Sequence, residues 1–453
     1  MKKRLLLMLL FATSLAGTLL SGCSSSTPTP DDSKHLSSLH ELHFSADSRP
    51  LKSAGVTLFV DYSTCIALGQ HSPFFNKMVP SLVDATRAYY AIEGSQLNQR
   101  PAADTYQHLR SIAEVNYADL KAAVDKMADL DGESVLLTDG EYFQPSIAKG
   151  NVNNPYMASA LKKWLLKGHD VFVLSEPYAE TANGKVYQKK RFYFIFTDVR
   201  LSGNFYDRVM QSIDFAQFPE VKMFHLSAEH PTKTTDGAKH FKLNPNIEAR
   251  QQGFGSHERQ EWQIAWRDGV EPLVISGVDP SSGAQLPNGD WAMKGIKVDK
   301  NSLGSYRITG VETKVYDINT LYADYVAAME ARQKFDLRAY GSPEPVSDFL
   351  VVDKKAFDRD GSLVLHFVPE MYYPQSVLTG SPYNYTKVDI CVSAVEPLFD
   401  QHESMFKFGS IDVPGAQNVS VASSIQQCLT DPKVKEKVLT TPIYSIYIKS
   451  PEY

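Results

Sequence analysis

Residues 56–65 read VTLFVDYSTC, and this stretch decides the expected fold. Its first five residues are apolar or β-branched, which predicts a buried central strand. Asp61 follows this strand directly and opens a short polar segment. Strand-like runs then alternate with helical periods as far as about residue 200. This alternation indicates an α/β fold with a mainly parallel sheet covered by helices.

The other elements of this region follow from local patterns. Strands are expected at residues 135–137, 171–174 and 192–196. Helices are expected at residues 80–89, 120–130 and 154–168, where apolar side chains recur at helical spacing. The first of these helices is expected to start near Pro80, with the proline in its first turn. Asn183 and Gly184 predict a hairpin turn before the last strand.

After about residue 200 the sequence is dominated by short β-rich runs between Gly, Pro, Asp and Asn, which favours β-sandwich-like modules. Such runs occupy residues 273–276, 306–316, 362–368 and 444–448. Helices are expected at residues 319–334 and, broken at Pro432, at 424–438. The expected domains are residues 53–200, a β-rich domain with a terminal helix at 201–340, and a C-terminal β-rich domain at 341–453.

The N-terminus has the layout of an export signal. Basic residues 2–4 precede the apolar residues 5–20, a stretch shorter than an ordinary membrane-spanning helix. Residues 20–23 read LSGC, which resembles the lipobox of bacterial lipoproteins and implies cleavage before Cys23 and acylation of its thiol. The alternative is an ordinary secretory signal with an incidental cysteine. Residues 1–22 are thus expected to be a signal peptide, and 23–52 a flexible tether.

Net charge and hydropathy narrow the kinds of partner and of membrane anchor that are expected for this chain. The formal charge of −6 becomes −9 when the three basic residues of the signal are removed, which does not suit a nucleic-acid partner. Lipid on Cys23 is the only expected membrane anchor, because no other apolar run approaches the length of a spanning helix. Ser24 stands where an aspartate resembles an inner-membrane retention signal in enterobacteria. The outer membrane is therefore the favoured location in a Gram-negative host. The sequence does not indicate which face of that membrane carries the chain.

Three further cysteines are present, at positions 65, 391 and 428. Cys391 and Cys428 would survive as a disulfide in an exported protein. Spacing does not show whether the two thiols meet, so their pairing is left open. The sequence contains no CxxC motif and no clustered Cys/His pattern of the kind that holds zinc.

Two acidic motifs stand directly after expected strands. Residues 61–65 (DYSTC) follow the first strand, and residues 138–141 (TDGE) follow a later one. Ligands bind at the carboxyl ends of strands in open α/β sheets, and hydroxyl and carboxylate oxygens are the ligands that Mg²⁺ prefers. The alternative is structural, since such aspartates also cap the next turn by accepting backbone N–H bonds.

These motifs resemble the metal-ion-dependent adhesion site of the von Willebrand factor A domain, which uses D-x-S-x-S, a threonine in a middle loop, and T-D-G. The resemblance covers roughly residues 53–200. It implies a Rossmann-type sheet and a site in which Asp61, Ser63 and Asp139 hold Mg²⁺ or another divalent cation. It also implies an open coordination place that an acidic side chain of a protein partner fills.

The sequence departs from this pattern at two ligand positions. Cys65 replaces the second serine, and a thiol is a poor ligand for a hard cation. The middle threonine is missing, because residues 116–120 read NYADL. Water fills one vacancy in this interpretation, and Asn116 or Asp119 supplies oxygen at the other. The resemblance therefore implies a degenerate metal site.

The hairpin between Glu176 and Arg191 also departs from the family, which has a short connection there. Glu176, Tyr178 and Glu180 either form an additional surface feature near the same edge or belong to a merely longer hairpin. Elsewhere, residues 358–361 (DRDG) look like part of a calcium loop but lack its closing glutamate, so a hairpin turn is expected. Residues 235–237 (TDG) follow no strand and predict only a turn.

These features favour a binding function over catalysis. The histidines lack the spacing of a zinc protease, and the sequence has no G-x-S-x-G motif. The main hypothesis is a lipid-anchored adhesion or envelope-assembly protein that holds a protein partner at the edge near Asp61 and Asp139. One alternative is a metal-dependent phosphoesterase with Ser63 as its nucleophile. Another is a structural subunit of an envelope machine.

Overall fold

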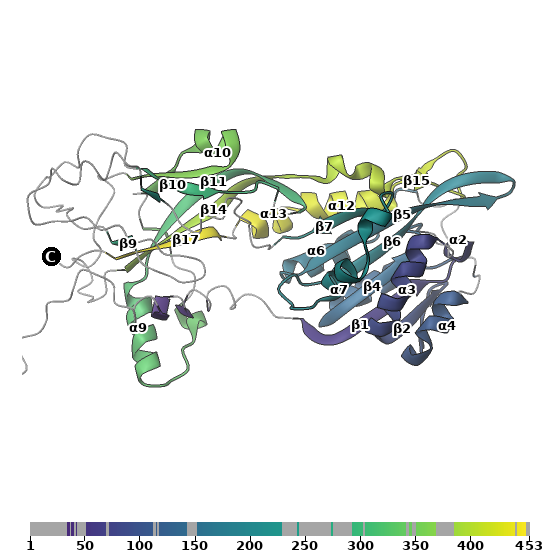
Figure 1. Ribbon diagram of the computed structural model, residues 1–453, viewed down its shortest axis with the longest axis horizontal. Coiled ribbons are helices and arrows are strands. Elements are labelled where there is room, and N and C mark those ends of the chain that lie inside the picture. Colours follow the sequence, from purple (N-terminus) through teal and green to yellow (C-terminus); the bar gives the residue numbers. More distant parts are fainter. Residues whose placement is uncertain are drawn as a thin grey trace, which may run out of the picture.

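The chain forms an elongated molecule, with a large sheet at one end and smaller sheets at the other (Figure 1). The computed structural model describes residues 34–36, 38–39, 42, 51–68, 72–111, 115, 117–142, 152–228, 242–243, 273–274, 292–301, 304–340, 344–346, 350–367, 385–439 and 442–449. Cys23, Asn116 and residues 235–237 lie outside these ranges.

The large sheet has seven strands in the order β3-β2-β1-β4-β6-β5-β7. They are β1 (Lys52–Asp61), β2 (Thr86–Glu93), β3 (Gln96–Arg100), β4 (Gly132–Thr138), β5 (Asp170–Ala182), β6 (Lys185–Thr197) and β7 (Lys222–Leu226). β1 is parallel to β2 and β4, whereas β6 is antiparallel to both β4 and β5. The expected α/β class is confirmed, but the expectation of a mainly parallel sheet is wrong. The sheet is mixed, because the β5–β6 hairpin inserts β6 between β4 and β5, and β3 and β7 also pair in antiparallel fashion.

β1 is the buried central strand that the sequence predicts. Val56, Leu58 and Val60 are buried on one face of the sheet, and Phe59 is buried on the other. Both faces of the strand therefore meet apolar side chains, which explains the nearly continuous apolar run.

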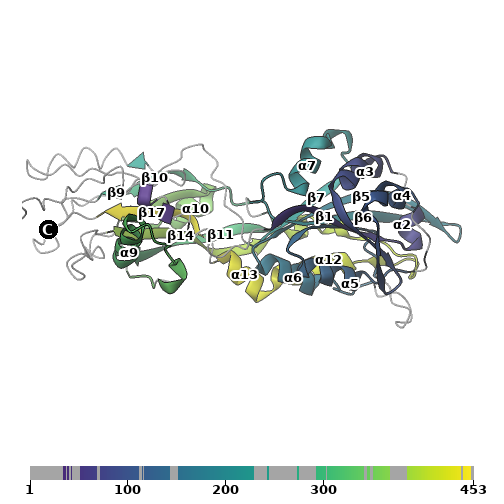
Figure 2. The same ribbon diagram turned by 90° about the horizontal axis from the view of Figure 1, so that it is seen from below.

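Helices cover both faces of the large sheet (Figure 2). One face carries α2 (Thr64–Leu68), α3 (Pro73–Ala85), α4 (Thr105–Arg110) and α7 (Phe205–Ser212). The other carries α5 (Leu120–Asp129), α6 (Ala158–Leu166), α12 (Ser420–Thr430) and α13 (Pro432–Leu439). α12 comes from near the end of the chain yet packs against α6, where the Met157 amide donates to the Ser424 hydroxyl at 3.2 Å. Lys162 also pairs with Asp431 at 2.6 Å.

The helix expected to start near Pro80 was misplaced. It begins at Pro73, behind Ser72, whose hydroxyl accepts a hydrogen bond from the Phe75 amide. The helix ends at Ala85, and Tyr89 lies in β2. Tyr89 is fully buried there, and its hydroxyl hydrogen-bonds that of Tyr62 at 3.0 Å. Tyr89 of β2 follows Leu82 and Ala85 of α3 at helical spacing, and this coincidence led to the wrong prediction.

The far end of the molecule is β-rich, as expected. One sheet has the order β12-β13-β10-β8 and another β11-β14-β17-β9. Their strands are β8 (Lys242–Leu243), β9 (Leu273–Val274), β10 (Ala292–Lys297), β11 (Tyr306–Asp317), β12 (Leu350–Val352), β13 (Ser362–Phe367), β14 (Tyr385–Pro397) and β17 (Pro442–Lys449). The helices here are α9 (Asn319–Glu330) and α10 (Lys354–Asp360). The short strands β15 (Phe408–Gly409) and β16 (Gln417–Asn418) pair with each other.

Two local predictions are settled at this level. Residues 358–361 do not form a hairpin turn, because α10 ends at Asp360 and Gly361 follows it in the left-handed conformation, with φ of 77°. Such a glycine is a common helix ending. Cys391 in β14 and Cys428 in α12 are both buried free thiols in this structure.

The described residues of the N-terminal segment are helical and lie beside α9, at the far end from the large sheet (Figure 1). Leu36 and Leu39 are buried in a cluster with Tyr322 and Tyr325 of α9. This part of the segment expected as a flexible tether is thus packed against the folded chain. Within the described ranges, no helix has both the length and the apolar character that crossing a membrane requires.

Candidate functional site

The two acidic motifs meet at one edge of the large sheet. Asp61 is the last residue of β1, and Asp139 follows the last residue of β4. The Thr138 hydroxyl donates a hydrogen bond to Asp61 Oδ2 at 2.7 Å and so joins the motifs directly. Both aspartates are buried, each with 1% of its surface exposed. The parallel alignment of β1 and β4 produces this meeting, because parallel strands end at the same edge.

Each aspartate also shapes its own turn. Asp61 Oδ1 accepts the Ser63 amide at 2.8 Å, and Asp139 Oδ1 accepts the Glu141 amide at 2.9 Å. Such hydrogen bonds are the ones expected if the aspartates serve to cap the turn after each strand, which was the alternative to metal binding. The Ser63 hydroxyl oxygen is buried beside the Asp61 carboxylate, whose charged form it favours, and it makes no hydrogen bond of good geometry to a described residue.

Gly140 lets the loop after β4 pass close to its neighbours. Its φ of +75° lies in the left-handed region. A Cβ at this position would lie 2.7 Å from Val421 Cγ2 of α12 and 3.0 Å from the Phe192 ring. The Tyr156 hydroxyl donates to the Gly140 carbonyl at 3.3 Å. Only glycine fits this position, and α12 supports the loop from outside.

The β5–β6 hairpin reaches beyond the sheet at this edge. β4 pairs with residues 192–196 of β6, and β7 pairs with residues 171–175 of β5. In the described strand pairs, residues 176–191 pair only with each other, and we call them the hairpin arm. The arm turns at Asn183 and Gly184, as predicted, with φ of 50° and 72°. It lies at the end of the molecule farthest from α9 (Figures 1 and 2).

Lys189 of the arm lies among the acids of the edge. Its side chain is fully buried, and its Nζ lies 3.6 Å from Asp139 Oδ2 and in contact with Glu141 Oε2. The ammonium also lies 5.5 Å from the centre of the Phe408 ring. A cation attached to the chain therefore already faces Asp139, one of the residues predicted to hold a metal ion, and its neighbour Glu141.

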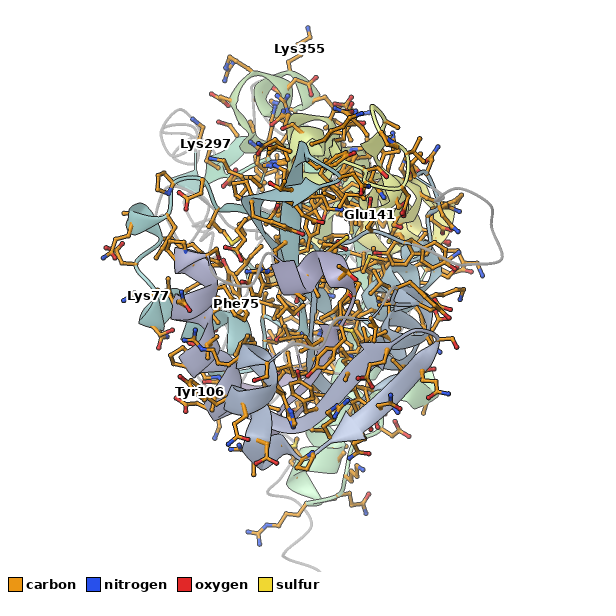
Figure 3. The ribbon with its side chains drawn as sticks, turned by 90° about the vertical axis from the view of Figure 1, so that its right-hand side faces the viewer. Phe75, Lys77, Tyr106, Glu141, Lys297 and Lys355 are labelled. Atoms are coloured by element: carbon orange, nitrogen blue, oxygen red, sulfur yellow. The ribbon has the colours of Figure 1, made fainter. Side chains whose placement is uncertain are left out.

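A second buried ion pair fixes the base of the arm. Arg191 Nη1 lies 2.9 Å from Glu176 Oε1, which also accepts a hydrogen bond from the Tyr193 hydroxyl at 2.7 Å. The Arg191 guanidinium lies 4.7 Å from the centre of the Phe75 ring. Figure 3 looks onto this end of the molecule and labels Phe75 and Glu141 on it. The Arg191–Glu176 pair thus joins the two strands at the base of the arm, Arg191 packs on Phe75 of α3, and Lys189 ties the arm to the loop after β4.

Glu176, Tyr178 and Glu180 pack inward from the arm. Glu176 and Glu180 are buried, and Tyr178 is half-buried. The Tyr178 hydroxyl donates to the Cys65 carbonyl at 3.3 Å. These side chains therefore connect the arm to the edge and do not form an exposed feature of their own.

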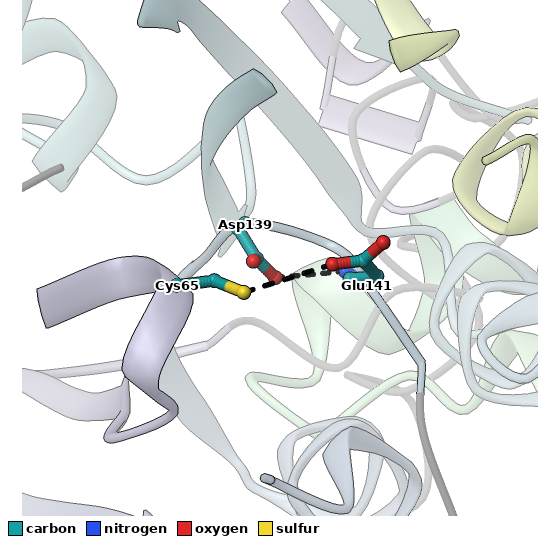
Figure 4. Close-up of side chains that lie close together, drawn as sticks. All are labelled: Cys65, Asp139 and Glu141. Carbon is teal, nitrogen blue, oxygen red and sulfur yellow. Dashed lines mark hydrogen bonds between the residues drawn. The ribbon is translucent and has the colours of Figure 1, made fainter. Parts of the chain in front are cut away.

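Cys65, Asp139 and Glu141 place potential ligand atoms within 4.8 Å of one another (Figure 4). Cys65 Sγ lies 3.8 Å from Glu141 Oε2. Burial, followed by the nearby charge of Asp139, raises the pKa of the Cys65 thiol strongly. The thiol therefore stays protonated near neutral pH, whereas a metal ligand must be a thiolate.

The predicted metal ligands do not fit a divalent cation in this arrangement. Both oxygens of Asp61 accept hydrogen bonds, and the free oxygen of Asp139 faces the Lys189 ammonium. Asp119, an alternative ligand, accepts the Lys121 amide and caps α5.

Burial also shifts the protonation of the edge. It raises the pKa of Asp61. It raises the pKa of Asp139 to about 8, an effect that Lys189 opposes and the charges of Asp61 and Glu141 reinforce. Burial alone would lower the pKa of Lys189, but the charges of Asp139 and Glu141 outweigh it and raise that pKa. The ammonium is therefore charged near neutral pH.

The sequence reasoning missed Lys189 and Arg191. A signal for them existed, because the turn at Asn183 and Gly184 sets the register of the hairpin. Counting outward from this turn places Arg191 opposite Glu176 and Lys189 opposite Tyr178, as the structure has them. Oppositely charged residues facing each other across two strands predict a cross-strand pair, which identifies Arg191 with Glu176, whereas the acidic partners of Lys189 lie outside the hairpin.

Comparisons with protein-family models, with curated proteins and with solved structures give no match, so the fold and the contacts at this edge are what support a functional proposal.

Proposed function

We propose that this chain is a lipid-anchored binding protein of the bacterial cell envelope, in the outer membrane of a Gram-negative host. It contacts a protein partner through the hairpin arm. The observation that carries the proposal is that the arm is fixed at its base and exposed along its outer part. Exposed positions alternate along it and continue around the turn, and Val186 is 64% exposed.

The fixed base supports binding because a preorganised surface loses little conformational entropy when a partner docks. The buried ion pair of Lys189 with Glu141 holds the arm against the edge, and the Arg191–Glu176 pair joins the two strands of the arm at its base, where Arg191 also packs on Phe75 of α3. The outer part presents backbone groups of a two-stranded hairpin, and such groups recognise extended segments of other chains.

The α/β sheet and the meeting of the Asp61 and Asp139 motifs support a relation to the von Willebrand A fold. The contacts of Lys189 do not support the metal-bridged mode of binding that this resemblance implies. We therefore place the partner on the outer surface of the arm.

The hydrolase alternative gains no support from the geometry. A nucleophilic serine needs a base within hydrogen-bonding distance. Among the described residues, the carboxylate beside the buried Ser63 hydroxyl is that of Asp61, whose two oxygens already accept the Ser63 amide and the Thr138 hydroxyl.

Site-specific photo-crosslinking in living cells tests the proposal. A photoreactive amino acid is placed at Val186 of the arm or, as control, at Val351 of β12, which is 41% exposed. We expect a discrete adduct of higher mass from Val186 and none from Val351. Absence of an adduct at Val186, or the same adduct at both positions, would argue against partner binding by the arm.

The membrane anchor has its own test. Cys23→Ser removes the thiol that the lipobox resemblance marks for acylation. We expect the wild type to incorporate labelled palmitate and to sediment with membranes. The variant should incorporate no label, and a variant that still does so would refute acylation at this residue.

A further inference from the structure

The surroundings of Lys189 contain more acids than bases. Asp139 and Glu141 contact its ammonium directly, and Asp61 is joined to the same edge through Thr138. Glu180 and Asp412 lie near enough for the positive charge of Lys189 to act on the pKa of each carboxyl in the lowering direction. Buried carboxylates in such a group require a cation or bound protons, because an uncompensated buried charge is very unfavourable.

Lys189 cannot leave this position easily. Its side chain is fully buried, and Phe408 of β15 lies over the ammonium. The next residue of β15, Gly409, also packs closely on the arm, since a Cβ added to it would lie 3.3 Å from the Gln188 carbonyl oxygen. On the other strand, Tyr178 is paired with Lys189 and hydrogen-bonded to the Cys65 carbonyl. The strand pairing and β15 therefore hold the ammonium against the acids.

We propose that the Lys189 ammonium is the resident cation of this edge, in the place where the family resemblance puts a divalent metal ion. Its charge compensates Asp139 and Glu141 and repels a second cation, so the wild-type chain takes up no Mg²⁺, Mn²⁺ or Ca²⁺ there. A lysine is attached to the chain, so the edge keeps its structure without a supply of metal. It also offers no open coordination place, and an acidic side chain of a partner has nothing to complete.

Removing the ammonium should convert the edge into a metal site. In Lys189→Met the carboxylates of Asp139 and Glu141 lose the ammonium that is hydrogen-bonded to Glu141 and lies 3.6 Å from Asp139 Oδ2. Both carry a buried oxygen that makes no hydrogen bond in the described structure, Asp139 Oδ2 and Glu141 Oε1. These oxygens are hard ligands and suit Mg²⁺ or Mn²⁺.

The experiment compares the soluble chain from residue 24 onward, prepared without chelator, as wild type, Lys189→Met and Lys190→Met. Lys190 is the neighbouring lysine and points to the other face of the strand, since successive side chains of a strand alternate. Metal content is measured by mass spectrometry, Mn²⁺ binding by electron paramagnetic resonance, and the melting temperature with and without millimolar Mn²⁺ or EDTA.

We expect wild type and Lys190→Met to contain far less than one metal ion per chain and to melt at the same temperature in Mn²⁺ and EDTA. Lys189→Met should melt lower in EDTA and rise by several degrees in Mn²⁺, because a ligand that binds only the folded state stabilises it. Asp139→Asn in the Lys189→Met background should abolish this rise.

Two results would overturn the assignment of Lys189. One is stoichiometric metal, or a loss of stability in EDTA, in the wild type, which would mean that the ion displaces Lys189 toward Cys65, Asp139 and Glu141. The other is a folded Lys189→Met that takes up no metal. If Lys189→Met does not fold, the metal content of the wild type and its melting temperature in EDTA still test whether a metal ion occupies the edge. No partner enters these measurements, so a failure of the crosslinking test leaves their meaning unchanged.

Discussion

Gly140 shows how much of the edge depends on one residue. A side chain at this position meets two obstacles, a positive φ and the Val421 methyl group of α12. Gly184 at the tip of the hairpin arm has a similar φ of +72° but nothing within 4 Å of an added Cβ. The two glycines therefore separate the effect of backbone conformation from that of crowding.

We predict that Gly140→Ala lowers the free energy of unfolding by about 2–4 kcal/mol, the sum of backbone strain and overpacking. Gly184→Ala should cost only about 1 kcal/mol, since backbone strain acts there alone. Urea unfolding of both variants measures the difference. Equal losses in the two variants would mean that α12 does not press on the loop after β4.

The Asp139 carboxyl makes stability depend on pH. Its pKa of about 8 in the folded chain lies above the ordinary value of 3.8. Between these values the folded state binds more protons than the unfolded state, so the free energy of unfolding falls as the pH rises. Asp61, whose pKa burial also raises, acts in the same direction.

We predict a loss on the order of 1–3 kcal/mol in the free energy of unfolding between pH 5 and pH 8. Asp139→Asn should remove most of this dependence, because an amide does not titrate in this range. Asp84→Asn, at an exposed residue of α3, serves as the control. An unchanged slope in Asp139→Asn would show that other groups control the pH response.

The sequence predicted the meeting of Asp61 and Asp139 because both follow strands whose ends share one edge of a parallel arrangement. It did not predict their cation. Lys189 lies 50 residues beyond Asp139 in the sequence, and only the long antiparallel pairing of β5 with β6 brings it back. Local patterns predict the strand ends well, whereas contacts that depend on the reach of a hairpin require its register.

At the scale of elements, α12 makes the C-terminal part of the chain part of the large sheet's core. Ile425 is fully buried in the same cluster as Leu161 and Trp164 of α6. Its neighbour Gln426 is exposed. A helix from the end of the chain thus supplies apolar surface that α5 and α6 would otherwise leave uncovered.

We predict that Ile425→Ala lowers the free energy of unfolding by about 2–4 kcal/mol, as expected for a cavity in a packed core. Gln426→Ala should change it by less than about 0.5 kcal/mol, because surface substitutions rarely do more. Urea unfolding followed by tryptophan fluorescence provides the measurement. An unchanged free energy of unfolding in Ile425→Ala would mean that α12 does not contribute to the core of the large sheet.

Elements with a strong local signal were predictable. β1 and α5 (Leu120–Asp129) match their expected positions, since one is a continuous apolar run and the other a clear helical period. β2 was missed because the pattern from Leu82 to Tyr89 mimics a helix, and β3 was missed because its sequence, QLNQR, is mostly polar. The packing of α12 on α6 was not predictable from periodicity, because an apolar face does not identify its partner.

At the scale of the whole molecule, the packing of the N-terminal segment bears on how the proposed lipid-anchored protein would be oriented on a membrane. Leu36 and Leu39 lie against α9, at the end opposite the hairpin arm (Figure 1). Lys34, the first described residue, stands 11 positions after Cys23, and an extended chain over those 11 steps spans at most about 40 Å. A lipid on Cys23 therefore keeps the α9 end near the bilayer and points the arm away from it.

Fluorescence quenching in liposomes tests this orientation. Single labels are placed by Lys334→Cys, just beyond α9, and by Asn183→Cys at the arm tip, in the acylated protein carrying Cys65→Ser. We predict strong quenching of the Lys334 label by a quencher lipid and little quenching at Asn183, because the two positions lie at opposite ends of the elongated molecule. The unacylated Cys23→Ser protein should show no quenching at either position. Equal quenching of both labels on the acylated protein would mean that the molecule lies flat, and the arm would then face the membrane and not a partner beyond it.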